Sequence, residues 1–260
     1  MTDGARVVSL RILVLSIVLA WLSKTAYWVG ALKQAAAWPL HDFFFPRPLQ
    51  RVDVALVAAL LPLALAGWAV VRGGAARLRD ALGALAAGSG VLLLHQLAFN
   101  DATFVTSLWA ALYGLWLHRA GASASETVTL RAGMFAQLTI AMFFLGGLVG
   151  KLTPGYWDGS VIHGLYFARS QHWTFALARA QLSPAALMEV ARWYARGLML
   201  SELLLASLPL WPIRASLRFA ALALVVLVAL NNFKLVSVTA PLLGMCLVGL
   251  LLERAARSSA

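Results

Sequence analysis

The sequence predicts an all-α integral membrane protein, a single polytopic domain over residues 1–260 with about eight transmembrane helices. Its composition is 62% hydrophobic and only 12% charged, about half the charged fraction of a soluble domain. The mean hydropathy is +0.82. Apolar runs long enough to cross a hydrocarbon core of about 30 Å recur along the chain. We therefore expect a helical bundle that is stable in a lipid bilayer.

The first part of the chain supplies most of the predicted spans. The first span, residues 7–28, is interpreted as a retained anchor, because it lacks a clear small-residue cleavage site and further spans follow it. A periplasm-like segment at residues 33–53 contains three phenylalanines between prolines, which suit an interfacial turn. The next spans are residues 54–71, 81–99, 103–118 and 132–150.

The longest polar stretch, residues 151–196, is too charged to span a membrane but is rich in Trp, Tyr, Phe and Leu. We expect one or two helices there that lie at the periplasmic surface of the bilayer. One of them should begin at Ser183-Pro184, with Ser as the N-cap and Pro at the first helical position. The last three predicted spans are residues 197–211, 219–231 and 235–252.

The distribution of Lys and Arg predicts the orientation of these spans. The short loops decide it, and the turn at residues 100–102 contains no Lys or Arg. We expect the N- and C-termini in the cytoplasm of a multi-pass protein of the cell inner (plasma) membrane, and residues 151–196 on the periplasmic side. The arginines on the predicted cytoplasmic side are Arg6, Arg11, Arg72, Arg77, Arg79, Arg119, Arg131, Arg214, Arg218, Arg254 and Arg257.

The net charge of +11 does not indicate a nucleic-acid partner. The 21 basic residues are scattered singly and in pairs, whereas a nucleic-acid footprint is a clustered patch. In a membrane protein the same charge orients helices and contacts anionic lipid. Cys246 is the single cysteine, so an intramolecular disulfide is excluded and a small buried apolar role is expected. Membrane lipid is the predicted partner, and a protein partner in the membrane stays open.

Ionisable side chains at membrane depth are costly to bury, so each is a functional candidate. Glu202 lies in the sixth predicted span with no charged neighbour along the helix. It is expected to be protonated, to pair with Lys151 or Lys234, or to be hydrogen-bonded inside the bundle. A structural tie between helices is an equally reasonable interpretation.

A second group of polar residues lies at the end of the third predicted span. His95 is close in sequence to Asn100 and Asp101, which fits a polar cluster at a cavity mouth or a proton relay. A packing histidine with its hydrogen bonds satisfied is the more common case. Lys24 and Lys234 are expected to extend to the membrane interface.

The most informative string covers residues 146–159, Gly-Gly-Leu-Val-Gly-Lys-Leu-Thr-Pro-Gly-Tyr-Trp-Asp-Gly. Small residues end the fifth predicted span, and Lys151 stands where the helix leaves the membrane. Desolvation there favours the neutral amine and makes Lys151 a candidate base. The alternative is a lysine that anchors a helix end beside an aromatic belt. The candidate ligand-binding residues after it are Tyr156, Trp157, Asp158 and Gly159.

This string resembles the transmembrane domain of the vitamin K-dependent γ-carboxylases and their bacterial relatives, the HTTM proteins. The shared pattern is the Lys-Leu pair at 151–152, then an aromatic, an acid and a glycine eight residues after the lysine. The resemblance implies a reduced quinone as cofactor, Lys151 as the base that deprotonates it, and a site on the non-cytoplasmic side. The acid-bearing helix at Ser201-Glu202-Leu203 is also similar to bacterial members.

The sequence departs from this family at three points. The family's tryptophan comes five residues after the lysine, where this chain has Tyr156 and places Trp157 one residue later. The turn after the third span carries a functional histidine in the carboxylases, and here Ala102 stands at that place. We also expect no lumenal substrate-holding domain after the last span. The specific likeness covers about 20 residues.

Three functions are consistent with these residues. The first is an HTTM-like membrane protein that binds a quinone or lipid in an apolar, periplasm-facing cavity bordered by residues 151–159, Asn100, Asp101 and Glu202. Whether it is an enzyme stays open. The alternative is a non-catalytic membrane subunit or assembly partner of a larger membrane (redox) complex. A third is a DoxX-like or MauE-like partner of a redox system. No phosphate-binding loop or nucleophile elbow occurs, and a metal site at His163 and His172 with Asp158 or Glu189 is not expected.

Overall fold

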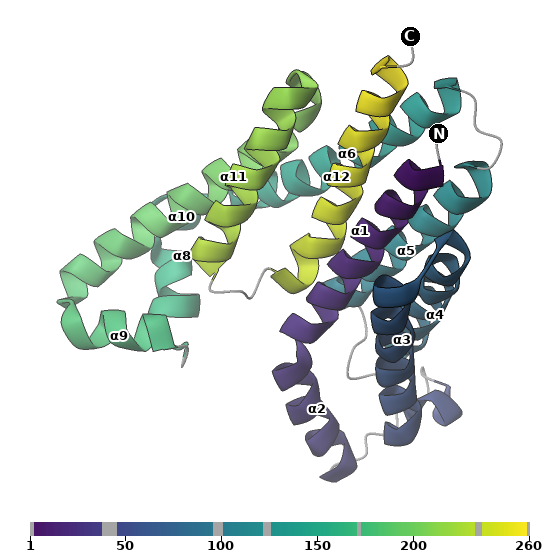
Figure 1. Cartoon of the computed structure of the whole chain (residues 1–260). Coiled ribbons are helices and arrows are strands. Elements are labelled where there is room, and N and C mark those ends of the chain that lie inside the picture. Colours follow the sequence, from purple (N-terminus) through teal and green to yellow (C-terminus); the bar gives the residue numbers. More distant parts are fainter. Residues whose placement is uncertain are drawn as a thin grey trace. The chain divides into compact units, whose positions relative to one another are not determined.

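The computed structural model describes residues 3–37, 46–95, 101–121, 126–170, 173–231 and 236–258, and every regular element in these ranges is a helix. The predicted all-α class is confirmed. The chain divides into two compact units (Figure 1). Unit 1 comprises Met1–Gln137 and Lys234–Ala260, and unit 2 comprises Leu138–Phe233. The boundary falls inside helix α6 (Glu126–Lys151). Each unit is therefore described by itself.

Unit 1 is built around helix α1 (Asp3–Ser23), which packs against α3, α4, α5 and α12. Figure 1 shows α1 beside α12 along much of its length. Leu10, Leu13 and Ile17 of α1 have no exposed surface, so this helix supplies the centre of the unit's core. The other elements of unit 1 are α2 (Thr25–Ala37), η1 (Arg47–Gln50), α3 (Val52–Arg72), α4 (Ala75–Leu93), α5 (Ala102–Gly121), the first part of α6, and α12 (Val236–Ser258).

Glycines permit the closest helix approaches in unit 1. A Cβ atom added to Gly88 of α4 would lie 2.5 Å from the carbonyl oxygen of Ala58 in α3. A Cβ on Gly133 of α6 would lie 2.7 Å from the carbonyl oxygen of Gly249 in α12. Backbones can come this close only where no side chain intervenes, as is typical of helix crossings in membrane proteins.

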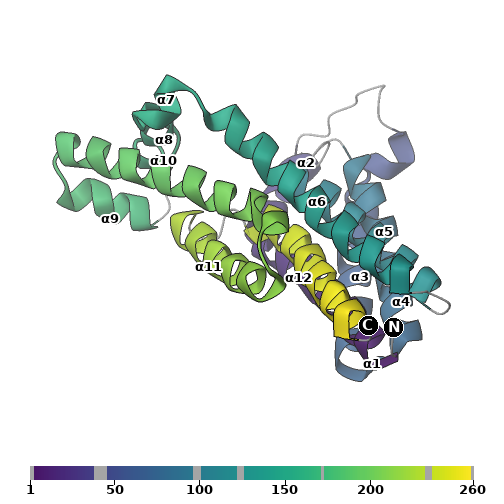
Figure 2. The ribbon, with the colours of Figure 1, turned by 90° about the horizontal axis from the view of Figure 1, so that it is seen from above.

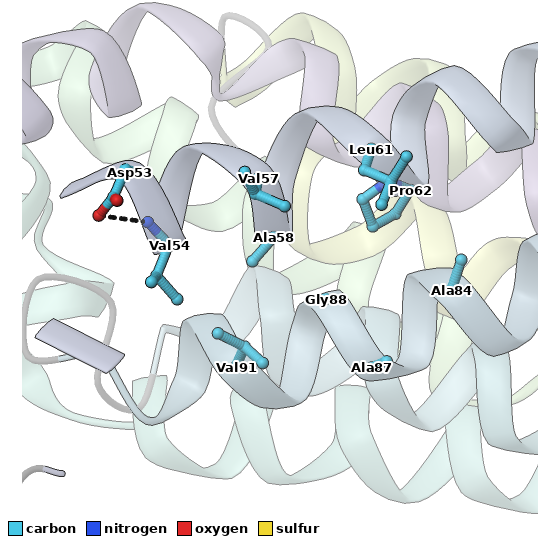
Figure 3. Close-up of a pocket in the computed structure, with 10 residues that line it drawn as sticks. All are labelled: Asp53, Val54, Val57, Ala58, Leu61, Pro62, Ala84, Ala87, Gly88 and Val91. Carbon is cyan, nitrogen blue, oxygen red and sulfur yellow. Dashed lines mark hydrogen bonds between the residues drawn. The ribbon is translucent and has the colours of Figure 1, made fainter. Parts of the chain in front are cut away.

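A mostly apolar pocket of about 410 Å³ lies between α3 and α4. Figure 3 shows Val57 and Ala58 of α3 facing the α4 residues Gly88 and Val91, with Asp53 at the start of α3. The Asp53 carboxylate accepts a hydrogen bond from the Val54 amide and also binds Arg51 at 2.6 Å. The charge at this end of the pocket is therefore already neutralised.

Unit 2 is built around helix α10 (Pro184–Ala206), as Figures 1 and 2 show. It packs against α11 on one side and against the short helices that precede it on the other. The predicted helix start is confirmed, because Ser183 is the N-cap and its hydroxyl accepts a hydrogen bond from the Ala186 amide. The remaining elements are the last part of α6, α7 (Pro154–Trp157), α8 (Ser160–Ile162), η2 (His163–Phe167), α9 (Trp173–Gln181), η3 (Leu208–Leu210) and α11 (Ile213–Asn231).

Helix α10 differs from the sequence expectation in its length. The sequence places an interfacial helix before residue 197 and a separate membrane span after it, whereas the structure has one helix of 23 residues. Arg, Ala, Leu and Met are good helix formers, so charge alone does not end a helix here. Gly197 lies within this continuous helix, and a Cβ added there would lie 3.3 Å from the side chain of Leu230 in α11.

Five helical stretches of the described chain are long and apolar enough to cross a membrane: Asp3–Ser23, Val52–Arg72, Thr127–Lys151, Ile213–Leu230 and Val236–Arg257. They coincide with the first, second, fifth, seventh and eighth predicted spans. Helices α4 and α5 are not among these five. Helix α4 carries Arg77, Arg79 and Asp80 in its first turns, and α5 contains Thr, Ser, Trp and Tyr, which are less apolar than Leu or Val. The predicted membrane character is supported at this coarser level, and the count of eight spans stays a prediction.

Candidate functional site

An ion pair between Lys151 and Glu202 is the centre of the candidate site in unit 2. The Lys151 Nζ atom lies 2.8 Å from Oε1 and 3.0 Å from Oε2 of Glu202, and it also donates to the Gly147 carbonyl oxygen at 3.1 Å. The side chains are 20% and 7% exposed. An ammonium has three protons to donate, so these three acceptors satisfy it.

The local sequence explains why this pair forms. Lys151 is the last residue of α6, where the final carbonyl groups of a helix lack partners within the helix and favour a nearby cation. Gly147, one turn earlier, faces the carboxylate, because a Cβ there would lie 3.4 Å from Glu202 Oε1. Of the sequence options for Glu202, the structure shows pairing with Lys151. Lys234, the other predicted partner, lies outside the described residues.

The turn after Lys151 depends on Gly159. This residue has φ of +84°, a left-handed conformation that favours glycine. A Cβ there would lie 2.5 Å from both the amide nitrogen and the Cα of Arg192 in α10. Asp158 accepts a hydrogen bond from the Ser160 amide at 2.8 Å. That bond lowers the pKa of Asp158 below its ordinary value. The acid and glycine of the string thus shape the turn and bring it against α10.

Trp157, the second aromatic residue of the 146–159 string, also contacts α10. The guanidinium of Arg196 lies 4.8 Å from the ring centre of Trp157 and 5.2 Å from that of Trp193. Such cation–π contacts hold exposed aromatic rings in place. Trp157 is exposed, and Tyr156 next to it is half-buried. Sequence reasoning missed Arg196 and Trp193, although their spacing of three residues on one helix face is a usable signal.

A cluster of aromatic side chains also packs against α10 in unit 2. Phe167 and Phe175 contact each other and also Tyr194 of α10, with ring centres 5.0 to 6.0 Å apart. The Tyr194 hydroxyl is buried and has no hydrogen-bond partner within the described chain. Burial raises the pKa of Tyr194, so the phenol stays protonated and is a potential donor. Tyr194 precedes Glu202 by eight residues of α10, which is about 12 Å along the helix axis.

A widened turn positions Phe167 in this cluster. The segment His163–Phe167 is a π-helix, in which the Ala168 amide donates to the His163 carbonyl at 2.8 Å, five residues back. Arg179 of α9 donates to the carbonyl oxygens of Phe167 and Ser170, each at 2.7 Å. These bonds close the segment against α9.

The candidate residues of unit 1 form a separate pair. Lys24 sits in the turn between α1 and α2, so the first predicted span is two helices. Its ammonium binds the Asp101 carboxylate, and Asp101 also accepts from the Thr103 amide at the start of α5. Lys24 is thus paired with an acid, and its extension to the membrane interface stays a prediction. His95 is 1% exposed, and Asn100 lies outside the described residues.

The sequence-predicted site residues therefore fall into two groups. Lys151, Glu202 and residues 156–159 belong to unit 2, and His95 and Asp101 belong to unit 1. A cavity shared by both groups stays a prediction. Of the two histidines considered for a metal, His163 begins the π-helix and His172 lies outside the described residues. No group of three His, Cys, Asp or Glu side chains suitable for a metal ion occurs in the described ranges.

Neither a scan against protein-family models nor searches of curated proteins and of solved structures found a match for this chain.

Proposed function

We propose that this chain is an HTTM-like integral membrane protein that binds a quinone or lipid headgroup at the Lys151–Glu202 pair. The proposed arrangement has about eight spans, cytoplasmic termini and the pair on the periplasmic side. The observation that supports it is a cation and a carboxylate held together at the end of a helix apolar enough to span a membrane. Ionic side chains at such depth are expensive and are typical of functional sites.

The residues around the pair have the chemistry to hold a quinone head. Lys151 is a donor for a carbonyl oxygen, and Glu202 is an acceptor for a hydroxyl. Tyr194, about two turns before Glu202 on α10, offers a buried phenol without a partner in the described chain. The rings of Phe167 and Phe175 supply apolar surface beside it. A reduced quinone, when bound, supplies an acidic hydroxyl and reducing electrons.

In this proposal Lys151 and Glu202 exchange a proton. The charged pair holds the proton on Lys151 Nζ, which lies 2.8 Å from Glu202 Oε1. Transfer of that proton to Glu202 leaves a neutral amine and a carboxylic acid, and the net charge of the site does not change. The amine then accepts a proton from a ligand hydroxyl at hydrogen-bond distance. Lys151 is the base, and Glu202 stores the proton that Lys151 releases.

The same geometry also favours a second candidate, a non-catalytic subunit or assembly partner of a membrane redox complex. All three ammonium protons of Lys151 already have acceptors, as in a structural tie between helices. Unit 2 also exposes more than half of the surface of Trp157, Trp173 and Trp193. Aromatic residues of this size are enriched both at membrane interfaces and at protein contacts.

The test is mass spectrometry of small molecules that copurify with the detergent-solubilised protein. Wild type is compared with Lys151→Ala and with the matched control Lys24→Ala, which removes the lysine of the other Lys–carboxylate pair. A quinone present in wild type and in Lys24→Ala but depleted in Lys151→Ala supports the proposal. Ordinary phospholipid alone, equal in all three, contradicts it, and a stoichiometric copurifying protein then favours the second candidate.

A further inference from the structure

A groove on the surface of unit 1 combines an apolar wall with one cation. It lies between α5 and α6 and has a volume of about 500 Å³. We call it the α5–α6 groove. The residues that line it are Trp109, Leu112, Tyr113, Trp116, Arg131 and Phe135. We propose that the α5–α6 groove binds one anionic phospholipid of the surrounding bilayer, with its phosphate at Arg131 and an acyl chain along the aromatic rings.

The aromatic side chains form a continuous wall. The Tyr113 ring lies 6.0 Å from that of Trp116 and 6.5 Å from that of Phe135, measured between ring centres. The Tyr113 hydroxyl donates to the Ala132 carbonyl oxygen at 3.1 Å. Its polar end is therefore satisfied, and the groove meets its apolar ring. Trp109, Leu112, Trp116 and Phe135 are each roughly half-exposed, an apolar surface that a lipid chain would cover.

The position of the cation gives the groove a polar end. Arg131 lies one turn before Phe135 on α6, and the hydrogen bond from Tyr113 to Ala132 places Tyr113 level with that turn. Trp109 lies one turn before Tyr113 on α5, on the side away from Trp116. An amphiphile laid in the groove would thus have its charged head near Arg131 and its tail towards Trp109. Arg131 lies five residues after the first residue of α6, so its long side chain can extend towards that end of the helix.

Charge complementarity selects an anionic head. Arg131 is exposed, and none of the ion pairs between described residues includes it. The distribution of basic residues predicts this end of α6 on the cytoplasmic side, where anionic lipids are enriched. The α3–α4 pocket differs, because no cation lines it and its one charged lining residue, Asp53 (Figure 3), is already paired with Arg51. An anionic lipid should therefore choose the α5–α6 groove.

Native mass spectrometry with a defined lipid mixture tests this inference. Detergent-purified protein is titrated with equal amounts of phosphatidylglycerol and phosphatidylcholine that carry the same acyl chains. Wild type should retain phosphatidylglycerol in preference. Arg131→Gln should retain it about fivefold less, the effect of one basic residue near a charged surface. The loss of phosphatidylcholine should be smaller, because its choline cation offsets the charge of its phosphate. The matched control is Arg218→Gln, which removes an exposed arginine of unit 2 that does not line the groove.

A second variant tests the apolar wall. Trp109→Ala removes a half-exposed ring, so the fold should tolerate it, and retention of both lipids should fall together. The proposal is overturned if wild type retains the two lipids equally, or if Arg131→Gln and Arg218→Gln have the same effect. These outcomes are independent of the Lys151 experiment, because the groove and the ion pair share no residue.

Discussion

The Lys151 ammonium and the Glu202 carboxylate form an ion pair in which both carboxylate oxygens accept a hydrogen bond from the same nitrogen. The pair joins α6 to α10 within unit 2, across 51 residues of sequence. Neither side chain has much access to water. Desolvating two charges costs free energy that their mutual attraction offsets only while both are present. Removing one partner and removing both should therefore have different consequences.

The first prediction concerns the stability of this pair. Lys151→Met leaves the Glu202 carboxylate buried without its cation, which should lower the free energy of unfolding by about 3 kcal/mol. The double variant Lys151→Met/Glu202→Leu removes both charges and should recover most of that loss. Thermal unfolding in detergent, followed by circular dichroism, measures the difference. Equal unfolding midpoints for the single and double variants would show that the two charges are not coupled.

The second prediction concerns Gly159. Gly159→Ala places a methyl group in left-handed backbone and within 2.5 Å of the Arg192 backbone, so the turn should detach from α10. The strain alone costs about 1–2 kcal/mol. Hydrogen exchange of the amides in residues 154–162 should become faster. Gly164→Ala is the matched control, because a Cβ there meets nothing within 4 Å. In that variant the amides of residues 154–162 should exchange as fast as in wild type.

The third prediction uses two glycines of one helix that should respond with opposite signs. Alanine is the better helix former by about 1 kcal/mol, so Gly83→Ala in open space should raise the unfolding midpoint. Gly88→Ala should lower it, because the new Cβ would lie 2.5 Å from the Ala58 carbonyl oxygen. Thermal melts of the two variants in the same detergent decide the matter. A higher unfolding midpoint for both variants would mean that α3 and α4 can move apart with little loss of free energy.

The fourth prediction is a dependence on pH at Asp158. The hydrogen bond from the Ser160 amide lowers the pKa of Asp158, so the ionised form stabilises the folded turn. For a lowered pKa this stabilisation is present at neutral pH and is lost as the pH falls through the pKa of the folded state. Exchange of the Ser160 amide, corrected for its intrinsic pH dependence, should accelerate in that acidic window. Asp158→Asn should remove the dependence; a variant that keeps it would assign the effect to another group.

The helices were largely predictable because their signals are local. The start of α10 rests on Ser183 and Pro184, which are adjacent in sequence, and long apolar runs predict α1, α3 and α12. The continuity of α10 was missed, because a change from charged to apolar composition resembles a boundary although Arg and Leu are equally compatible with helix.

The contacts between helices were less predictable. Pairing of Glu202 with Lys151 was one of several options, since sequence does not specify which helix ends meet. The partner of Lys24 was not foreseen for the same reason, because Asp101 is 77 residues away in the chain. The orphan hydroxyl of Tyr194 depends on the packing of Phe167 and Phe175, which no spacing rule describes.

The π-helix at His163–Phe167 has a consequence for how this segment can change in evolution. Such a turn is equivalent to one residue inserted into an α-helix, and each residue of a helix turns the chain by about 100°. Deleting one residue here would restore an α-turn and rotate Phe167 away from Tyr194 and Phe175. The length of this segment is therefore linked to the aromatic contacts that follow it, and single-residue insertions or deletions should survive only with compensating substitutions on α9 or α10.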